Sequence, residues 1–232
     1  MRNRMYFGDR DNRELGVIVT RLPDIPIAEE DGEWVQIAGE DGERFVSNGA
    51  LRPVTFTVPL WIPPTADANA VTAWLSGTGE LRFNNWGWFW KARVEGETHL
   101  APCVFNDGWT AAPVFKAKPH RYVWPEAEPI TVTESGFLLP GRGTAQAKPL
   151  IEITGTGDIT VMIDHSTVMV NDLGGTVALD CEAKIAYNGE ILMTEQTTVV
   201  DGVWPTLSPG TTEISWVGAV SSVVITPRWR YR

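Results

Sequence analysis

Short stretches in which apolar and polar residues alternate run through most of this 232-residue chain. Two of them lie at 150–154 and 159–163, and a longer one extends over 52–62. On the longer stretch the apolar side chains share one face: Val54, Phe56, Val58 and Leu60. Strict alternation gives a strand one buried and one exposed face, which is typical of antiparallel sheets. Because Gly, Pro and Asn separate the stretches, the pattern predicts an all-β protein built of sandwiches or barrels.

Residues 65–77 depart from this alternation and predict a helix. The segment is rich in alanine, and its larger apolar residues recur at helical spacing, on the face that holds Val71, Trp74 and Leu75. Thr65 or Asp67 can serve as the N-cap, and the segment ends at Gly77. We expect this to be the one substantial helix of the chain.

The chain is long enough for two domains, and a joint rich in Pro and Glu at 124–130 indicates where they meet. We place the boundary near residue 128. The N-terminal domain, 1–128, is then a β-sandwich or split barrel that carries the helix, and the C-terminal domain, 129–232, is a second β-sandwich. Within that second domain, the Gly-Thr-Gly-Asp sequence at 155–158 predicts a turn between two strands.

The composition excludes several classes of protein. The net charge is −10, and each predicted domain stands near −5, so neither resembles a nucleic-acid-binding domain. The longest apolar run, around Val223, is too short for a transmembrane helix, and the first ten residues lack the apolar region of a signal peptide. We therefore expect assembly in the cytoplasm, where Cys103 and Cys181 remain free thiols.

The segment 24–43 holds eight carboxylates and no Lys or Arg. Adjacent carboxylates such as those of Glu29, Glu30 and Asp31 do not converge across a cleft, as acid–base catalysis requires. They also match the spacing of a calcium loop only in part. Such a density of negative charge must face water, so two placements stay open: a solvated outer loop, or the wall of an acidic channel that repels phosphates.

No residue pattern predicts an enzyme. The three histidines, His99, His120 and His165, are 21 and 45 residues apart, and none has a His or Cys partner at metal-ligand spacing. The sequence contains neither a Gly-x-Ser-x-Gly elbow nor a phosphate-binding loop. We expect no catalytic, cofactor-binding or metal-binding residues and no cofactor.

Tryptophan is abundant, with eleven residues, and three of them alternate along one strand: Trp86, Trp88 and Trp90. Their indoles share one face, which can be a core face beneath the helix, a contact between subunits, or a platform for sugar rings. At the C-terminus, Arg228, Arg230 and Arg232 alternate with two aromatic residues. This pattern predicts a final strand with its aromatic side chains inward and its charges outward.

An ordered series of short sequences in the last third of the chain carries a family resemblance. It begins with the two strands and the Gly-Thr-Gly-Asp sequence at 148–164. Further members are Val-Ala-Leu-Asp-Cys-Glu from Val177, Trp-Pro-Thr-Leu-Ser-Pro-Gly from Trp204, Glu-Ile-Ser-Trp-Val-Gly from Glu213 and Val-Val-Ile-Thr-Pro-Arg-Trp-Arg from Val223. The series resembles the C-terminal domain of distal tail proteins (Dit) of long-tailed bacteriophages and prophages. The resemblance implies a galectin-like jelly-roll sandwich for 129–232.

The N-terminal half resembles the ring-forming domain of the same family more loosely, through its order of strands, helix and long hairpin. One departure is the acid in Gly39-Glu-Asp-Gly, where a basic residue is expected. The resemblance implies a structural hub of the tail tip, or baseplate, of a siphovirus virion. Six copies form a ring that joins the tail tube protein to the tail-associated lysin and to tail fibre or receptor-binding proteins. DNA passes through the channel unbound, and no membrane is involved. Two alternatives stay open: a carbohydrate-binding module for host-wall adsorption, and a tail-tube-like ring protein.

Overall fold

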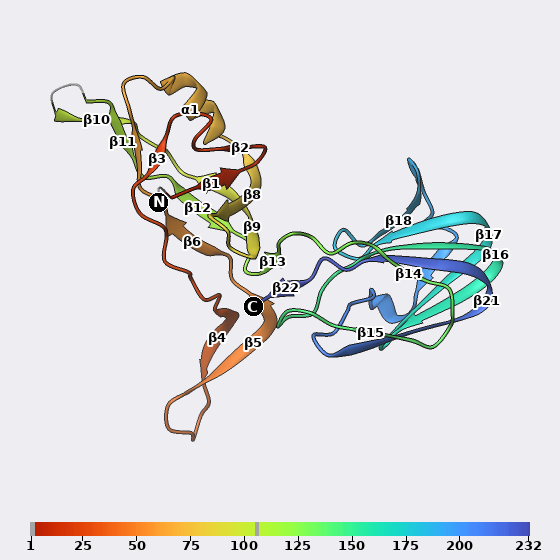
Figure 1. Cartoon of the computed structure of the whole chain (residues 1–232). Helices are drawn as coiled ribbons and strands as arrows, with labels where there is room; N and C mark the ends of the chain where they lie inside the picture. Colours follow the sequence, from red (N-terminus) through yellow and green to blue (C-terminus); the bar gives the residue numbers. More distant parts are fainter. Residues whose placement is uncertain (1–2, 105–106) are drawn as a thin grey trace. The chain divides into compact units, whose positions relative to one another are not determined.

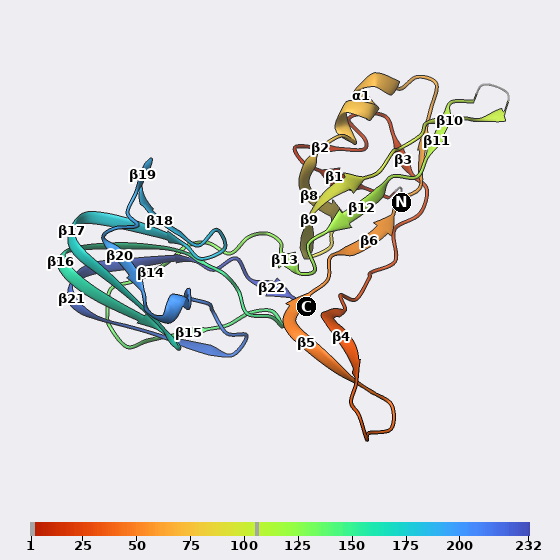
Figure 2. The same ribbon diagram turned by 180° about the vertical axis from the view of Figure 1, so that it is seen from behind.

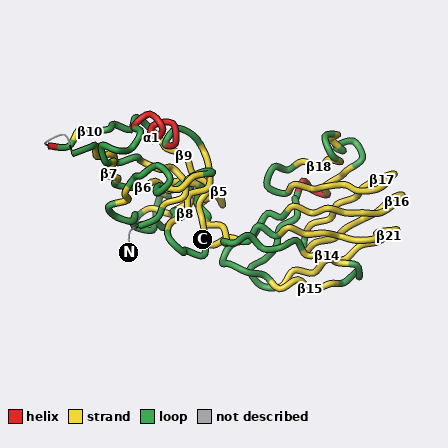
Figure 3. Tube along the Cα trace, turned by 45° about the horizontal axis from the view of Figure 1, so that its top comes forward, coloured by secondary structure: helices red, strands yellow, loops and turns green. Residues whose placement is uncertain are grey.

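The computed structural model describes residues 3–104 and 107–232. Strands dominate it (Figure 3), and α1 (Ala68–Trp74) is the only α-helix among the described residues. The all-β prediction is therefore confirmed. The chain divides into two compact units, one reaching Arg121 and including Arg232, the other Tyr122–Tyr231. We describe each by itself below.

The larger sheet of the first unit runs in the order β2-β1-β8-β9-β12-β6. Its strands are β1 (Met5–Phe7), β2 (Arg10–Asp11), β6 (Val54–Thr57), β8 (Thr78–Phe83), β9 (Trp88–Glu95) and β12 (Val114–Ala117). A smaller sheet, in the order β10-β11-β7-β3, consists of β3 (Ile18–Val19), β7 (Leu60–Ile62), β10 (Ala101–Pro102) and β11 (Trp109–Ala111). Every pair of strands is antiparallel, as the alternation predicts.

The two sheets and the helix enclose one core that contains Met5, Phe83, Trp90 and Phe115. The helix begins where the sequence indicates, because the Asp67 side chain accepts hydrogen bonds from the N–H groups of Asn69 and Ala70. Its inner face buries Val71 and Trp74, as predicted.

The stretch 52–62 forms two strands, so the prediction of one continuous strand is wrong. The side chains of Val54, Val58 and Leu60 are buried, but β6 pairs in the larger sheet and β7 in the smaller one. The chain crosses between the sheets at Val58 and Pro59. Pro59 has no N–H to donate to a ladder, so the pairing is interrupted there. Its carbonyl oxygen accepts from the Thr20 N–H at 3.0 Å.

A third element of this unit is a two-stranded ribbon of β4 (Glu30–Gln36) and β5 (Glu43–Leu51). It projects away from the sheets of its own unit, as the orange hairpin in Figure 1 shows. Glu33 faces Val46, Trp34 faces Phe45, and a bulge interrupts the register near Glu30.

The sheet of the second unit runs in the order β14-β21-β16-β17-β18-β19, with β15 also on β21 and β20 also on β17. The strands are β14 (Ile130–Val132), β15 (Phe137–Pro140), β16 (Leu150–Ile163), β17 (Ser166–Asp180), β18 (Ile185–Asn188), β19 (Ile191–Leu192), β20 (Thr197–Val199) and β21 (Thr211–Thr226). A short 3-10 helix, η2 (Val200–Gly202), follows β20. Two short strands outside this sheet, β13 (Arg121–Val123) and β22 (Arg230–Tyr231), pair with each other. One core includes Ile151, Ile153, Val161 and Ile163 from β16.

The predicted turn at 155–158 is wrong, because β16 runs through it as one 14-residue strand. Its register shifts against β17 between Gly157 and Ile159, and Gly157 has a φ of +75°. A bulge of this kind bends a strand without ending it. Glycine is required on the neighbouring β21 too, since a Cβ on Gly218 would lie 2.6 Å from the Asp158 carbonyl oxygen. Both halves of β16 bury odd-numbered side chains in the same core, so the alternation of the sequence is kept across the irregularity.

Candidate functional site

The β4–β5 hairpin carries most of the acidic segment and exposes nearly all of it. Glu33, Glu40, Asp41 and Glu43 are exposed. Figure 2 shows the backbone of this hairpin from behind. Apolar side chains are exposed beside them: Trp34 is 66% exposed and Val46 is 53% exposed. The ring of Trp34 lies 5.3 Å from that of Phe45 across the strands. A surface that combines exposed apolar groups with charge is typical of protein–protein contacts.

Arginines from outside the segment 24–43 lie against its carboxylates. Arg52 donates to Asp31 at 3.0 Å, Arg44 to Glu40 at 3.0 Å and Arg232 to Glu30 at 2.9 Å. Hydrogen bonds from Asn48 and Arg52 hold the pKa of the Asp31 carboxyl below its ordinary value. The segment contains no basic residue, but these three arginines partly compensate its negative charge in the folded chain. The sequence did not predict this compensation.

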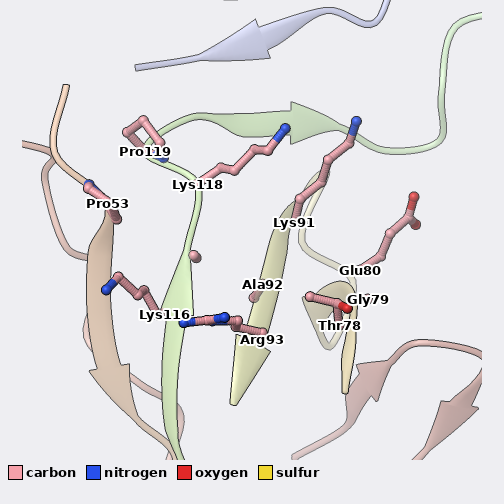
Figure 4. Close-up of a pocket in the computed structure, with 11 residues that line it drawn as sticks. Pro53, Thr78, Gly79, Glu80, Lys91, Ala92, Arg93, Lys116, Lys118 and Pro119 are labelled. Carbon is pink, nitrogen blue, oxygen red and sulfur yellow. The ribbon is translucent and has the colours of Figure 1, made fainter. Parts of the chain in front are cut away.

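The opposite charge gathers on the face of the larger sheet that points away from the core. A groove of about 560 Å³ lies over β8, β9 and β12 (Figure 4). Four basic side chains line it: Lys91, Arg93, Lys116 and Lys118. The remaining lining is Pro53, Thr78, Gly79, Glu80, Ala92, Ala117 and Pro119. We call this the basic groove. In a chain of net charge −10 it is a distinct local excess of positive charge.

The strand register explains why these side chains come together. Arg93 is directly opposite Thr78 on one side and Lys116 on the other, and Lys91 is opposite Glu80. Besides Glu80, a second carboxylate adjoins the row: Glu95 accepts from Lys116 at 2.8 Å and lies 3.5 Å from Arg93. The hydrogen bond from Lys116 lowers the pKa of Glu95 below its ordinary value. The sequence signal for the groove was the alternation in Lys91-Ala-Arg and Lys116-Ala-Lys, which we did not interpret as one surface.

The three tryptophans pack against one another, as their alternation predicts. The Trp86 and Trp88 rings are 4.6 Å apart, and the Trp88 and Trp90 rings meet edge to face at the same separation. Trp90 is 1% exposed and belongs to the core, whereas Trp86 and Trp88 are half-buried and pack against it. Arg121 lies over the Trp88 ring at 5.1 Å. The cluster therefore extends the core to the surface.

The C-terminal arginines do not all point outward as predicted. Trp229 is buried, but Arg228 makes two hydrogen bonds with the Asp180 carboxylate, at 2.9 and 3.1 Å. Arg230 donates from Nε to the carbonyl oxygen of Gln146. These two side chains therefore join segments that are far apart in the sequence.

The remaining candidate residues are histidines and cysteines. His99 and His165 are exposed, each near one carboxylate, at Glu97 and Asp164. Cys103 and Cys181 are free thiols, as expected, although only Cys181 is buried. Within residues 3–104 and 107–232 no three His, Cys, Asp or Glu side chains are placed to hold a metal ion. In the same residues, no helix is long and apolar enough to span a membrane.

Comparison with known proteins shows a likeness in structure. No family model matches the sequence, and no curated protein matches it. The structure is similar to that of the Dit protein (gp 19.1) of SPP1, with a TM-score of 0.74 and 14% sequence identity over 99% of each chain. That protein is described as a paradigm of the hub adsorption apparatus in phages that infect Gram-positive hosts. It is also similar to a chain of the phage P2 baseplate in its activated conformation with Ca, with a TM-score of 0.53 and 7% identity over 100% of this chain and 99% of that one. The resemblance to distal tail proteins is thus confirmed at the level of the fold.

Proposed function

We propose that this chain is a structural hub protein of the tail tip of a long-tailed bacteriophage or a related prophage. The observation that carries the proposal is the likeness to the SPP1 Dit protein, because it extends over 99% of both chains. A likeness confined to one sandwich would fit many unrelated proteins, whereas both units are matched here in their order along the chain.

In this role six copies close into a ring between the tail tube protein and the lysin, tail fibre or receptor-binding components. The chain is assembled in the host cytoplasm and incorporated into the virion. A structural hub needs no chemistry of its own, so the proposal assigns no catalytic residue to this chain. The acidic composition suits a conduit through which DNA passes without adhering.

Copy number in the virion tests the proposal. Quantitative mass spectrometry of purified particles should find about six copies per virion, since cyclic assemblies are closed. Antibody labelling in electron micrographs should mark the distal end of the tail. Many copies along the tail shaft would instead identify a tube protein, and label absent from the particle would refute a role in the virion.

Carbohydrate binding is the second candidate, and the half-buried rings of Trp86 and Trp88 are the feature that favours it. Half-exposed aromatic rings can stack on sugars. A glycan array probed with the purified protein tests this function. Binding that is lost in Trp88→Ala and retained in Trp34→Ala, a variant of an exposed indole elsewhere, would establish it.

A further inference from the structure

The hairpin and the basic groove carry opposite charge on the same chain. Between Glu30 and Leu51 the hairpin has six acidic residues and one basic residue, Arg44. Counting its ion-pair partners Arg52 and Arg232 as well, three negative charges remain. In the basic groove, four basic residues stand against the carboxylates of Glu80 and Glu95, which leaves two positive charges. The two surfaces are complementary in sign.

The covalent geometry keeps the two surfaces of one copy apart. The base of the hairpin adjoins the groove, because Pro53, which lines the groove, follows Leu51 by two residues. The tip, at 37–42, lies about 20 Å from that base, since each strand residue advances roughly 3.3 Å. Figures 1 and 2 both show the tip pointing away from β9 and β12. In this conformation the tip of the hairpin therefore lies away from the groove of its own copy.

The groove also has the dimensions of a two-stranded ribbon. It lies over three strands, and neighbouring strands are about 4.8 Å apart, so the outer two are separated by roughly 10 Å. A hairpin two strands wide fits across that span. The aliphatic stems of Lys91 and Lys118 offer apolar surface below their charges, which suits the exposed Trp34 and Val46 side chains of the hairpin.

We propose that the tip half of the β4–β5 hairpin of one copy, residues 33–46, docks in the basic groove of a second copy of this chain. The carboxylates of Asp41 and Glu43 then meet the ammonium groups of Lys91 and Lys118. The contact is head-to-tail, because the two surfaces differ and lie at separate places on each copy. Contacts of this kind either close into a ring or grow into a filament. The inference rests on the proposed ring and names the surfaces that hold it together.

Charge reversal tests the docking. Two variants of the full chain are compared with the wild type by light scattering over a concentration series: Asp41→Lys with Glu43→Lys, and Lys91→Glu with Lys118→Glu. Each brings like charges together, so the concentration at half assembly should rise about tenfold or more. Raising the salt should weaken assembly of the wild type in the same direction. Circular dichroism checks that each variant is folded.

A mixture of the two variants is the decisive measurement. The reversed hairpin of one variant meets the reversed groove of the other, and the two unchanged surfaces also meet, so the mixture should assemble at concentrations at which neither variant alone does. One chain that carries all four substitutions should assemble as well. The matched control, Glu190→Lys with Glu195→Lys, makes the same change of charge as the hairpin variant on exposed residues of the second unit, and it should assemble like the wild type.

A zero-length carboxyl–amine cross-linker, applied to a mixture of ¹⁴N and ¹⁵N chains, then locates the contact. Mixed-isotope links between Asp41 or Glu43 and Lys91 or Lys118 support the docking. A ring that forms normally in both reversed variants, without such links, overturns the docking and leaves the proposed function intact, with the hairpin in the channel or on the outer rim. A wild type that stays monomeric at every concentration overturns the docking, and the copy number in virions then decides the proposed function separately.

Discussion

The Arg228–Asp180 pair allows a quantitative test of how the second unit closes at the C-terminus. The guanidinium makes two hydrogen bonds with the carboxylate, and the two side chains are only 22% and 19% exposed. Arg228 also has a φ of +53°, in the left-handed region that costs a residue with a Cβ about 1 kcal/mol. The perturbations are Arg228→Ala, which removes the pair, and Arg228→Gly, which removes the pair and relieves the backbone.

The structure gives the expected magnitudes. Exposed ion pairs contribute 0.2 to about 1 kcal/mol, and hydrogen bonds to charged groups in protected sites about 1.5–3 kcal/mol. With about a fifth of each side chain exposed, we expect Arg228→Ala to lower the free energy of unfolding by about 2 kcal/mol. Arg228→Gly should be roughly 1 kcal/mol less harmful. Asp180→Ala should cost about 3 kcal/mol, because that carboxylate also accepts from the N–H groups of Glu182 and Ala183.

Urea unfolding of the full chain at pH 7, followed by far-UV circular dichroism, measures these differences. A loss of 2 kcal/mol corresponds to a midpoint roughly 1 M lower. Arg142→Ala, at an exposed position, is the control and should stay within about 0.5 kcal/mol of the wild type. Two results refute the reasoning. One is a double variant, Asp180→Ala with Arg228→Ala, whose loss equals the sum of the single losses. The other is a glycine variant less stable than the alanine variant.

Other consequences of the structure can be measured independently. Ile153→Ala should lower the free energy of unfolding by about 3 kcal/mol, because the side chain is fully buried, whereas Glu152→Ala, exposed on the same strand, should change it by less than about 0.5 kcal/mol. Burial raises the pKa of the Cys181 thiol to about 12, so a thiol reagent at pH 8 should label only Cys103 rapidly. The variant Cys103→Ser keeps Cys181 alone, and rapid labelling of that variant would contradict this expectation. Burial alone would raise the pKa of Asp11, but hydrogen bonds from the Arg4 side chain and nearby backbone N–H groups outweigh it and lower the pKa below 3.8. The Asp11 carboxylate therefore stabilises the fold above pH 3.8, and this stabilisation is lost as the pH falls through the lowered pKa of Asp11. Asp11→Asn has no such carboxylate, so its free energy of unfolding should fall less than that of the wild type over the same acid range.

Local chemistry along the sequence was sufficient to predict the class of fold and which face of most strands is buried. Alternation alone assigns Val54, Val58 and Ile153 to buried positions, because side chains on a strand point to opposite faces in turn. The start of α1 could be predicted for a similar reason, since Asp67 caps N–H groups only two and three residues away. Each of these features depends on neighbours within a few residues.

Features that depend on distant partners were decided only by the tertiary structure. Alternation continues through Pro59, so nothing local indicates that β6 and β7 pair in different sheets. The glycines at 155–158 fit a turn and a bulge equally well, and the long ladders with β17 and β21 select the bulge. The ion-pair partners of the acidic segment also depend on the tertiary structure, because Arg232, which donates to Glu30, lies 202 residues away in the sequence.

The basic groove shows most clearly what sequence alone leaves open. Lys91 and Arg93 on β9 are some 25 residues from Lys116 on β12 and Lys118 directly after it, and each pair by itself resembles an ordinary solvated strand face. Only the register of β9 against β12, which sets Arg93 opposite Lys116, turns two short alternations into one cationic surface. Residue types and periodicity determine which side chains a strand exposes. Which exposed side chains become neighbours is determined by strand pairing, because backbone hydrogen bonds join segments regardless of their separation in the chain.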